Sequence, residues 1–144
     1  MQAKLAPYVV RIDHVGIAVP DLDQAIALYT DLFGAQVVHR EHNAEQLIDE
    51  AMLRIGDSTT LLQFIAPSGP ASPIENFLEK HGPGLQQMAY EVSDVEAAAD
   101  AARGQGIRVL YDAARRGTAD SRINFLHPKD CGGVLIELVE KPSN

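Results

Sequence analysis

The segment Ile12–Asp21, with the sequence IDHVGIAVPD, has a counterpart later in the chain, Leu85–Asp94, with the sequence LQQMAYEVSD. In each segment a polar residue, His14 or Gln87, opens an apolar run typical of a β-strand, and an aspartate stands seven residues later. Apolar residues at helical spacing follow each aspartate, which is the position of a helix cap. The pattern therefore predicts a strand followed by a helix, twice in one chain.

The strands that end the two halves, LLQFI and LIELV, also match, because each holds one polar residue among apolar β-formers, Gln63 and Glu137. His14 and Gln87 lie 73 residues apart, and Gln63 and Glu137 lie 74 apart. An offset this constant indicates an internal duplication. We therefore predict two βαβββ modules with four polar side chains placed alike.

Strand and helix patterns divide the two halves in the same way. We predict a single α+β domain over residues 1–144, in which two paired βαβββ modules form a curved mixed sheet that encloses a cleft, with the helices outside. The first module covers about residues 8–66 and the second about 84–140, with a linker and short helix at 67–83. The predicted strands are residues 8–19, 35–42, 48–55, 59–65, 85–92, 107–111, 123–126 and 134–139. The predicted helices are residues 22–33, 72–80 and 94–103. In the first helix we expect one apolar stripe to face the core: Leu22, Ala25, Ile26, Tyr29 and Phe33.

Composition excludes several classes of function. The net charge of −8 argues against nucleic acid or an anionic membrane as the main partner. No apolar run approaches the length of a membrane span and the first residues lack the apolar core of a signal peptide, so we expect a cytoplasmic protein. The single cysteine, Cys131, allows neither an internal disulfide nor a thiolate metal site, and we expect it to be inert.

The duplication predicts that His14, Gln63, Gln87 and Glu137 surround one point. Imidazole, amide and carboxylate donors together suit a divalent ion of intermediate hardness that keeps open positions for a substrate. Taken singly, these residues have structural explanations too: a histidine after an aspartate is often hydrogen-bonded within the fold, and a glutamine in a strand is often half-exposed. Glu137 is harder to explain in that way, because a carboxylate in an apolar strand needs a partner.

Five segments of the chain resemble the methylmalonyl-CoA epimerase family of the vicinal oxygen chelate superfamily. They are IDHVGIAV (12–19), EAML (50–53), SPIENFLEK (72–80), NFLHPK (124–129) and GVLIEL (133–138). The resemblance runs from about residue 11 to 140. It implies paired βαβββ modules, a homodimer, a divalent metal and interconversion of the C2 epimers of methylmalonyl-CoA. It also implies cobalt as the metal, with zinc, manganese or nickel as alternatives.

The resemblance also implies the roles of individual residues. His14, Gln63, Gln87 and Glu137 would be the metal ligands, and Glu50 and Glu137 would be the two catalytic acid/base groups; without the resemblance, Glu50 could be a solvated strand residue. The family pattern Gly-Leu-His-His is Gly-Leu-Gln-Gln at residues 84–87 of this chain. Because an amide oxygen is a weaker donor than an imidazole nitrogen, we expect metal affinity to be reduced.

An acyl-CoA substrate needs cationic side chains for its phosphates, and one basic concentration in this acidic chain could supply them: Arg115, Arg116, Arg122 and Lys129. We assign the remaining histidines to structural or surface positions: His39, His42, His81 and His127. Two alternative functions stay open. One is an enzyme of the same fold with altered or metal-independent proton-transfer chemistry, and the other is a non-catalytic module that binds a small molecule.

Overall fold

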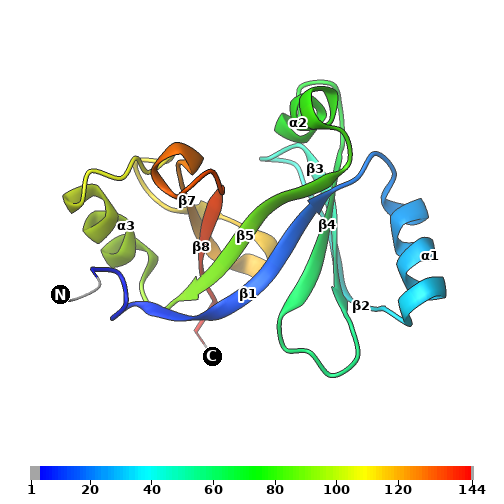
Figure 1. The fold of residues 1–144 in the computed structure, drawn as a ribbon, viewed down its shortest axis with the longest axis horizontal. Coiled ribbons are helices and arrows are strands. Elements are labelled where there is room, and N and C mark those ends of the chain that lie inside the picture. The colour runs from blue at the N-terminus through cyan, green and yellow to red at the C-terminus, as the bar shows by residue number, and fades with distance from the viewer. Residues whose placement is uncertain (1–3, 144) are drawn as a thin grey trace. The chain divides into compact units, whose positions relative to one another are not determined.

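The structure, a computed structural model, describes residues 4–143 and has the predicted α+β class, with the order βαβββ occurring twice (Figure 1). No helix within these residues is both long and apolar enough to cross a membrane. The elements are β1 (Val9–Ala18), α1 (Leu22–Phe33), β2 (Gln36–Asn43), β3 (Ile48–Arg54), β4 (Leu61–Pro67), α2 (Pro73–His81), β5 (Gly84–Val92), α3 (Val95–Gly104), β6 (Arg115–Arg116), the 3₁₀ turn η1 (Thr118–Asp120), β7 (Arg122–Leu126), the 3₁₀ turn η2 (Pro128–Asp130) and β8 (Ile136–Glu140).

The chain divides into two compact units. The first unit is residues 14–86, and the second unit is the start of the chain up to residue 13 together with the residues from 87 onward. The strand order is β2-β3-β4-β1-β5-β8-β7-β6, and β1 contributes its two ends to different units. In the first unit β1 is parallel to β4, and in the second β5 is parallel to β8 in the same way.

Helix α1 covers one face of the sheet of the first unit (Figure 1). Asp21 caps it as predicted, because its side chain accepts a hydrogen bond from the backbone N–H of Gln24 at 3.0 Å. Tyr29 packs edge-on against Phe64 with ring centroids 4.8 Å apart. Phe33, predicted to lie in the core, is 58% exposed, because it is the last residue of the helix and lies beyond the stripe that faces the sheet.

Helix α2 packs on the other face of the same strands. Ser72 caps it, accepting a hydrogen bond from the N–H of Ile74 at 3.2 Å, and Pro73 occupies the first turn. Ile74, with Phe77 and Leu78 beside it, packs against Ile48 and Ile65 of β3 and β4. Part of this second face is therefore apolar and covered.

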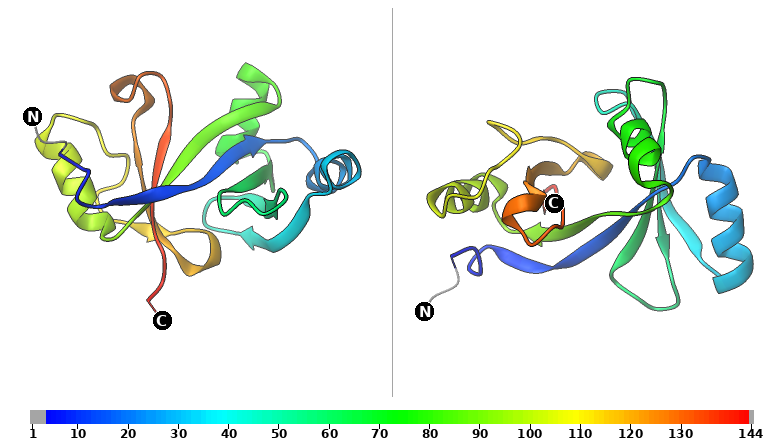
Figure 2. Two further views of the ribbon diagram at one scale, coloured as in Figure 1. Left: turned by 60° about the horizontal axis from the view of Figure 1, so that its bottom comes forward. Right: turned by 45° about the horizontal axis from the view of Figure 1, so that its top comes forward.

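In the second unit, helix α3 packs its alanines on the sheet. Ala98 and Ala102 are fully buried against Leu126 and Leu138. Small side chains bring the helix close to the strands, and the carboxylate of Glu140 in β8 accepts a hydrogen bond from the first helical N–H, of Val95, at 2.9 Å. The N-terminal residues Leu5 and Tyr8 pack into the same cluster. The left view of Figure 2 shows the beginning of the chain beside α3.

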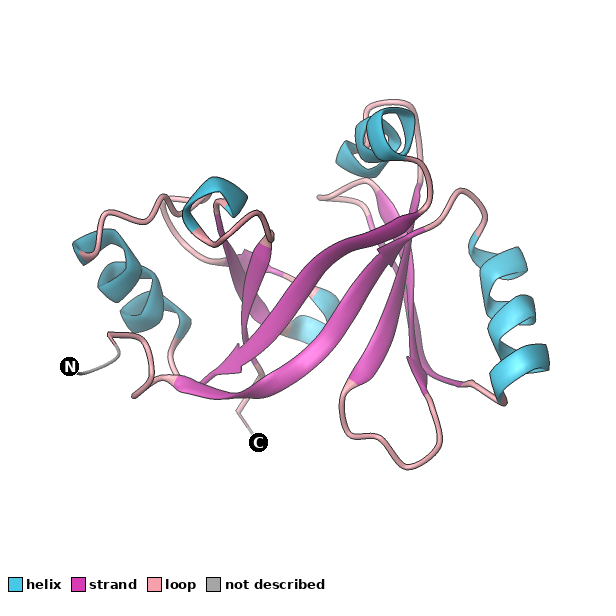
Figure 3. Ribbon diagram, viewed as in Figure 1, coloured by secondary structure: helices cyan, strands magenta, loops and turns pink. Residues whose placement is uncertain are grey.

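The predicted strand 107–111 is wrong. Only an isolated bridge, between Val109 and Leu126, forms there, and the short strand β6 lies further on, at residues 115–116. The cause is Asn124, whose side chain accepts from the N–H of Tyr111 at 3.1 Å and donates to its carbonyl at 3.0 Å. Figure 3 shows the consequence: β2, β3 and β4 are neighbouring strands, whereas the segment before β7 is mostly loop.

Candidate active site

Strand register places three predicted site residues on one face of the first unit. Gln63 is the Cα partner of both Gly16 and Met52. Because side chains alternate along a strand, His14 lies on the same face as Gly16, and Glu50 on the same face as Met52. His14, Glu50 and Gln63 therefore share one face, the one that α2 covers in part and that α1 does not.

Glu50 and Gln63 are joined by a hydrogen bond. Gln63 Nε2 donates to Glu50 Oε2 at 3.1 Å, and both side chains are buried, as His14 is. Glu50 is only 1% exposed, so the alternative of a solvated strand residue does not hold. A buried carboxylate with a donor amide is suited to accept and release a proton.

Two residues beside Glu50 were missed from the sequence. In the hairpin of β2 and β3, Glu41 is the direct Cα partner of Glu50, so the two carboxylates share a face. His39, two residues before Glu41, lies on that face too, with its Nε2 2.5 Å from Glu41 Oε1. The first strand of the hairpin ends one residue later than predicted, at Asn43, which pairs with Ile48, and this register brings Glu41 opposite Glu50.

The second unit holds a matching pair. Ala89 is the Cα partner of Glu137, so Gln87 is a diagonal neighbour of Glu137 on the same face. Gln87 Nε2 donates to Glu137 Oε1 at 3.2 Å, and both residues are buried. The carboxylate therefore has the partner that its apolar strand requires.

Apolar residues surround this second pair. Phe125 is the Cα partner of Glu137, and Ile123 lies on the same face two residues before it. Tyr111 packs edge-on against Phe125 with centroids 5.8 Å apart, and the guanidinium carbon of Arg115 lies 3.8 Å from the centre of the Tyr111 ring. The ring therefore holds Arg115 by a cation–π contact.

The four predicted basic residues differ in how they are engaged. Arg116 Nε donates to Asp120 at 2.8 Å, and Arg122 lies 3.9 Å from Glu96 and 3.8 Å from Glu140. Lys129 lies in the turn η2, where its backbone N–H donates to His127 Nδ1 at 3.1 Å. Among the residues described, only Arg115 of these four is placed on an aromatic ring.

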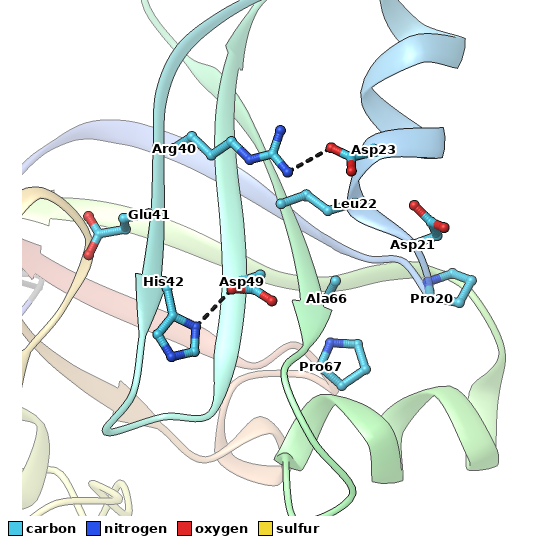
Figure 4. Close-up of a pocket in the computed structure, with 10 residues that line it drawn as sticks. All are labelled: Pro20, Asp21, Leu22, Asp23, Arg40, Glu41, His42, Asp49, Ala66 and Pro67. Atoms are coloured by element: carbon cyan, nitrogen blue, oxygen red, sulfur yellow. Dashed lines mark hydrogen bonds and ion pairs between the residues drawn. The ribbon is translucent and has the colours of Figure 1, made fainter.

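A pocket of about 400 Å³ lies on the opposite face of the first unit, between α1 and the strands (Figure 4). Arg40 forms an ion pair with Asp23 at 2.6 Å, and His42 with Asp49 at 2.8 Å. In Figure 4 the side chain of Glu41 points away from Arg40 and His42, across the strand. This pocket is therefore separate from the face that carries Glu50.

The model of the Glyoxalase/Bleomycin resistance protein/Dioxygenase superfamily matches residues 13–125. Mitochondrial methylmalonyl-CoA epimerase of Mus musculus is 39% identical over 129 residues, which are 89% of this chain and 71% of that protein. The chain belongs to the methylmalonyl-CoA epimerase family of this superfamily.

Solved structures of the family have the same fold. Methylmalonyl-CoA epimerase from Mycobacterium tuberculosis is 54% identical with a TM-score of 0.91, covering 94% of this chain and 91% of that one. A variant of the Streptomyces coelicolor epimerase, solved in complex with 2-nitronate-propionyl-CoA, is 45% identical with a TM-score of 0.89, covering 94% and 99%. The predicted family and its βαβββ architecture are thereby confirmed.

The predicted metal ligands fit a divalent ion chemically. They offer one imidazole, two amides and one carboxylate. Within residues 4–143, no group of three or more His, Cys, Asp or Glu side chains lies close enough together to hold a metal, so the two amides would have to complete the ligand set. Gln63 and Gln87 use Nε2 in their hydrogen bonds to carboxylates, whereas an amide ligates a cation through Oε1. Hydrogen bonding and ligation therefore do not compete for one atom.

Cys131, the only thiol, lies outside both pairs. Burial, and secondarily the negative charge of Asp130, raise the pKa of the Cys131 thiol. A thiol with a raised pKa is a poor nucleophile at neutral pH, in line with the inert cysteine predicted from the sequence.

Proposed function

We propose that this chain interconverts the two C2 epimers of methylmalonyl-CoA by removing a proton from C2 and returning one to the opposite face. The observation that carries the proposal is the presence, in a member of this family, of one buried amide–carboxylate pair in each unit: Gln63 with Glu50, and Gln87 with Glu137. A module that only bound a small molecule would not need two buried carboxylates, whose desolvation is costly.

The substrate explains why two acid/base groups are needed. C2 lies between a thioester carbonyl and a carboxylate, so loss of its proton places negative charge on an enolate oxygen. In one direction Glu50 accepts the C2 proton and Glu137 donates a proton to the other face, and in the reverse direction the roles exchange. Each amide fixes one oxygen of its carboxylate, which holds the group in orientation.

We further propose that His14, Gln63, Gln87 and Glu137 hold a divalent ion, with cobalt favoured over zinc, manganese or nickel. Such an ion, when bound, stabilises enolate charge as a Lewis acid. Gln87 replaces an imidazole of the family pattern with a weaker amide donor, so the affinity of this chain for the ion should be low for the family.

Arg115 is the best candidate of the four basic residues for binding a phosphate of coenzyme A. Its guanidinium is held on the Tyr111 ring, and Tyr111 is in turn held by Asn124. A preoriented guanidinium loses less conformational entropy when it binds a phosphate than a mobile one does. The other three basic residues, Arg116, Arg122 and Lys129, would contribute to the same rim. The homodimer stays a prediction of the family resemblance, and the cytoplasmic location a prediction of the composition.

The test is exchange of the C2 hydrogen of methylmalonyl-CoA with heavy water, followed by NMR. The protein is measured as purified, after chelation, and after addition of cobalt. We expect exchange together with inversion, lost on chelation and restored by cobalt. Folded protein that exchanges nothing in any of the three states would refute the epimerase proposal and favour a binding module.

A further inference from the structure

We infer that Glu41 and His39 form a proton path that exchanges the proton of Glu50 with water while the enolate is bound. The inference rests on the proposed function, because it requires Glu50 to accept the C2 proton. It gives Glu41 a role as a proton carrier and His39 a role beyond the surface position expected from the sequence.

The first observation is the position of Glu41. It is the direct Cα partner of Glu50 in the β2–β3 hairpin. Directly opposed residues of antiparallel strands have Cβ atoms about 4.5–5.5 Å apart, within reach of proton transfer between carboxyl groups, directly or through one water. Like charges directly opposite each other destabilise a sheet, so this pairing is costly unless one carboxylate carries a proton or a cation lies nearby.

The second observation is the contact of Glu41 with His39. His39 Nε2 lies 2.5 Å from Glu41 Oε1, so a neutral imidazole there can accept a proton from the Glu41 carboxyl group. Histidine changes protonation state near neutral pH more readily than any other side chain, which suits it to pass protons to solvent.

The third observation is the order of exposure across the strands. Glu50 is 1% exposed, whereas the side chains of Glu41 and His39 are 14% and 38% exposed. Strand β2, which carries both, is the edge strand of the sheet order. The three groups thus lead from a buried carboxylate on β3 to the solvent-exposed edge.

Epimerisation requires such a path. Each conversion of one epimer leaves Glu50 protonated and Glu137 deprotonated, so before the next conversion of that epimer Glu50 must release a proton and Glu137 must take one up from water. The path performs the first of these two steps. On the path, protonated Glu50 gives its proton to the Glu41 carboxylate, Glu41 gives it to neutral His39, and the His39 imidazolium gives it to water. Each carrier then regains its starting state, and Glu50 is again a carboxylate.

The second unit has other residues at the positions of Glu50 and Glu41. Ile123 is the Cα partner of Val139 as Glu50 is of Ile65, so an isoleucine stands where the first unit has its base. Arg115 is the Cα partner of Ile123 as Glu41 is of Glu50, so an arginine, a residue type that does not release its proton in proteins, stands where the first unit has Glu41. The path therefore serves Glu50 and not Glu137, and this asymmetry provides the test.

The experiment uses methylmalonyl-CoA deuterated at C2, each epimer separately, in ordinary water. Loss of deuterium with retained configuration is compared with inversion. For the epimer whose C2 hydrogen faces Glu50, we expect Glu41→Gln and His39→Gln to lower the ratio of retained-configuration exchange to inversion by roughly 100-fold, the low end of what a positioned proton-transfer group contributes. For the other epimer the ratio should not change.

The matched control is His42→Gln, which removes another cross-strand His–carboxylate pair, with Asp49, from the opposite face of the same hairpin. It should leave both ratios unchanged, and added imidazole should restore exchange to His39→Ala. Because Glu41→Gln removes a like-charge pair, its melting temperature should equal or exceed that of the wild type.

Three outcomes would overturn the inference. They are equal losses for both epimers, a lower melting temperature of Glu41→Gln with an unchanged ratio, and a wild type that inverts the substrate but never exchanges with retention. A wild type without any exchange or inversion would instead refute the proposed function itself.

Discussion

In the first unit, the buried pair of Glu50 and Gln63 continues through Glu41 and His39 to the edge of the sheet. In the second unit, the pair of Gln87 and Glu137 is bordered by apolar residues, among them Ile123 and Phe125. Strands β1, β3 and β4 of the first unit pair as β5, β7 and β8 of the second do, so the duplication preserved this part of the backbone while the surroundings of the carboxylates diverged. Glu41 stands opposite Glu50 in the first unit, whereas Arg115 stands opposite Ile123, the counterpart of Glu50, in the second.

The edge strands of the two units also differ, in their length. In the first unit β2 runs unbroken from Gln36 to Asn43 and carries the path. In the second unit its counterpart is reduced to a bridge at Val109 and the two residues of β6, because Asn124 binds the backbone of Tyr111. The loop formed there positions Tyr111 and Arg115, so a segment that relays protons in one unit presents a cation in the other.

The largest expected effect comes from removing either carboxylate. Glu50→Gln and Glu137→Gln are nearly isosteric, so both proteins should fold, and each should lose inversion by roughly 10²–10⁴-fold, the contribution of a positioned acid/base group. Each variant should still exchange the C2 hydrogen of the one epimer that faces the remaining carboxylate. NMR in heavy water on each epimer measures this. If both variants lost exchange of the same epimer, the assignment of one carboxylate to each face would be wrong.

A second prediction concerns Asn124, which is fully buried. Its Oδ1 accepts from the N–H groups of Tyr111 and Phe125, at 3.1 and 2.9 Å, and its Nδ2 donates to the carbonyl of Tyr111. Asn124→Ala leaves these backbone groups without that partner, and we expect a loss of about 3 kcal/mol in the free energy of unfolding, measured in urea. Affinity for coenzyme A should fall with it, because Tyr111 no longer holds Arg115 in place.

The matched control in the first unit is Asn43→Ala. Asn43 is also buried, but its Oδ1 accepts one hydrogen bond, from the N–H of Gln46 at 3.0 Å, so the loss should be about 1 kcal/mol. Equal losses for the two variants would show that Asn124 does not define the loop of the second unit.

A third prediction concerns the departure from the family pattern at Gln87. Gln87→His supplies the imidazole of that pattern, and we expect cobalt to bind about tenfold more tightly, or about 1.4 kcal/mol, by calorimetry. Gln86→His is the control, because neighbouring side chains of a strand point to opposite faces. An equal gain in cobalt affinity from both substitutions would show that binding does not depend on which face of β5 carries the histidine. The proposed ligand set would then be wrong.

Much of this organisation follows from the sequence alone. The repeated offset gave the order of elements, and the caps at Asp21 and Ser72 lie where the pattern predicts. Gln63 and Glu137 could be recognised because one polar residue in an apolar strand contrasts with its neighbours. These are local signals, and local signals are what a single sequence carries best.

What the sequence did not reveal depends on contacts between strands. Strand β2 is polar throughout, so Glu41 and His39 showed no contrast, although the turn after Asn43 fixed their partners. The strand expected at 107–111 failed because Asn124, more than ten residues later, binds the backbone of Tyr111. Propensity describes Tyr111 and its neighbours correctly as β-formers, but a buried side chain from β7 decides their structure.

The smallest expected effect comes from a comparison of two loops, one before the last strand of each unit. Before β8, Asp130 binds Arg108 through three hydrogen bonds of 2.9–3.0 Å, two from the side chain and one from the backbone N–H. The Arg108 guanidinium, followed by the Arg108 N–H, holds the pKa of Asp130 well below its usual range. Before β4, Ser58 Oγ donates to the carbonyl of Thr60 at 2.7 Å, a bond without charge.

A depressed pKa in the folded state adds stability above the pKa of the unfolded chain, about 3.9 for aspartate, and that stability is lost as the pH falls through the folded value. Asp130→Asn should therefore lower the melting temperature at pH 7 by a small amount, since the pair is solvent-exposed. The difference from the wild type should shrink at pH values below about 4. Ser58→Ala should lower the melting temperature by an amount that does not change with pH. A deficit of Asp130→Asn that stayed constant down to pH 2 would mean that the loop is held by packing, and that the two units stabilise this turn in the same way.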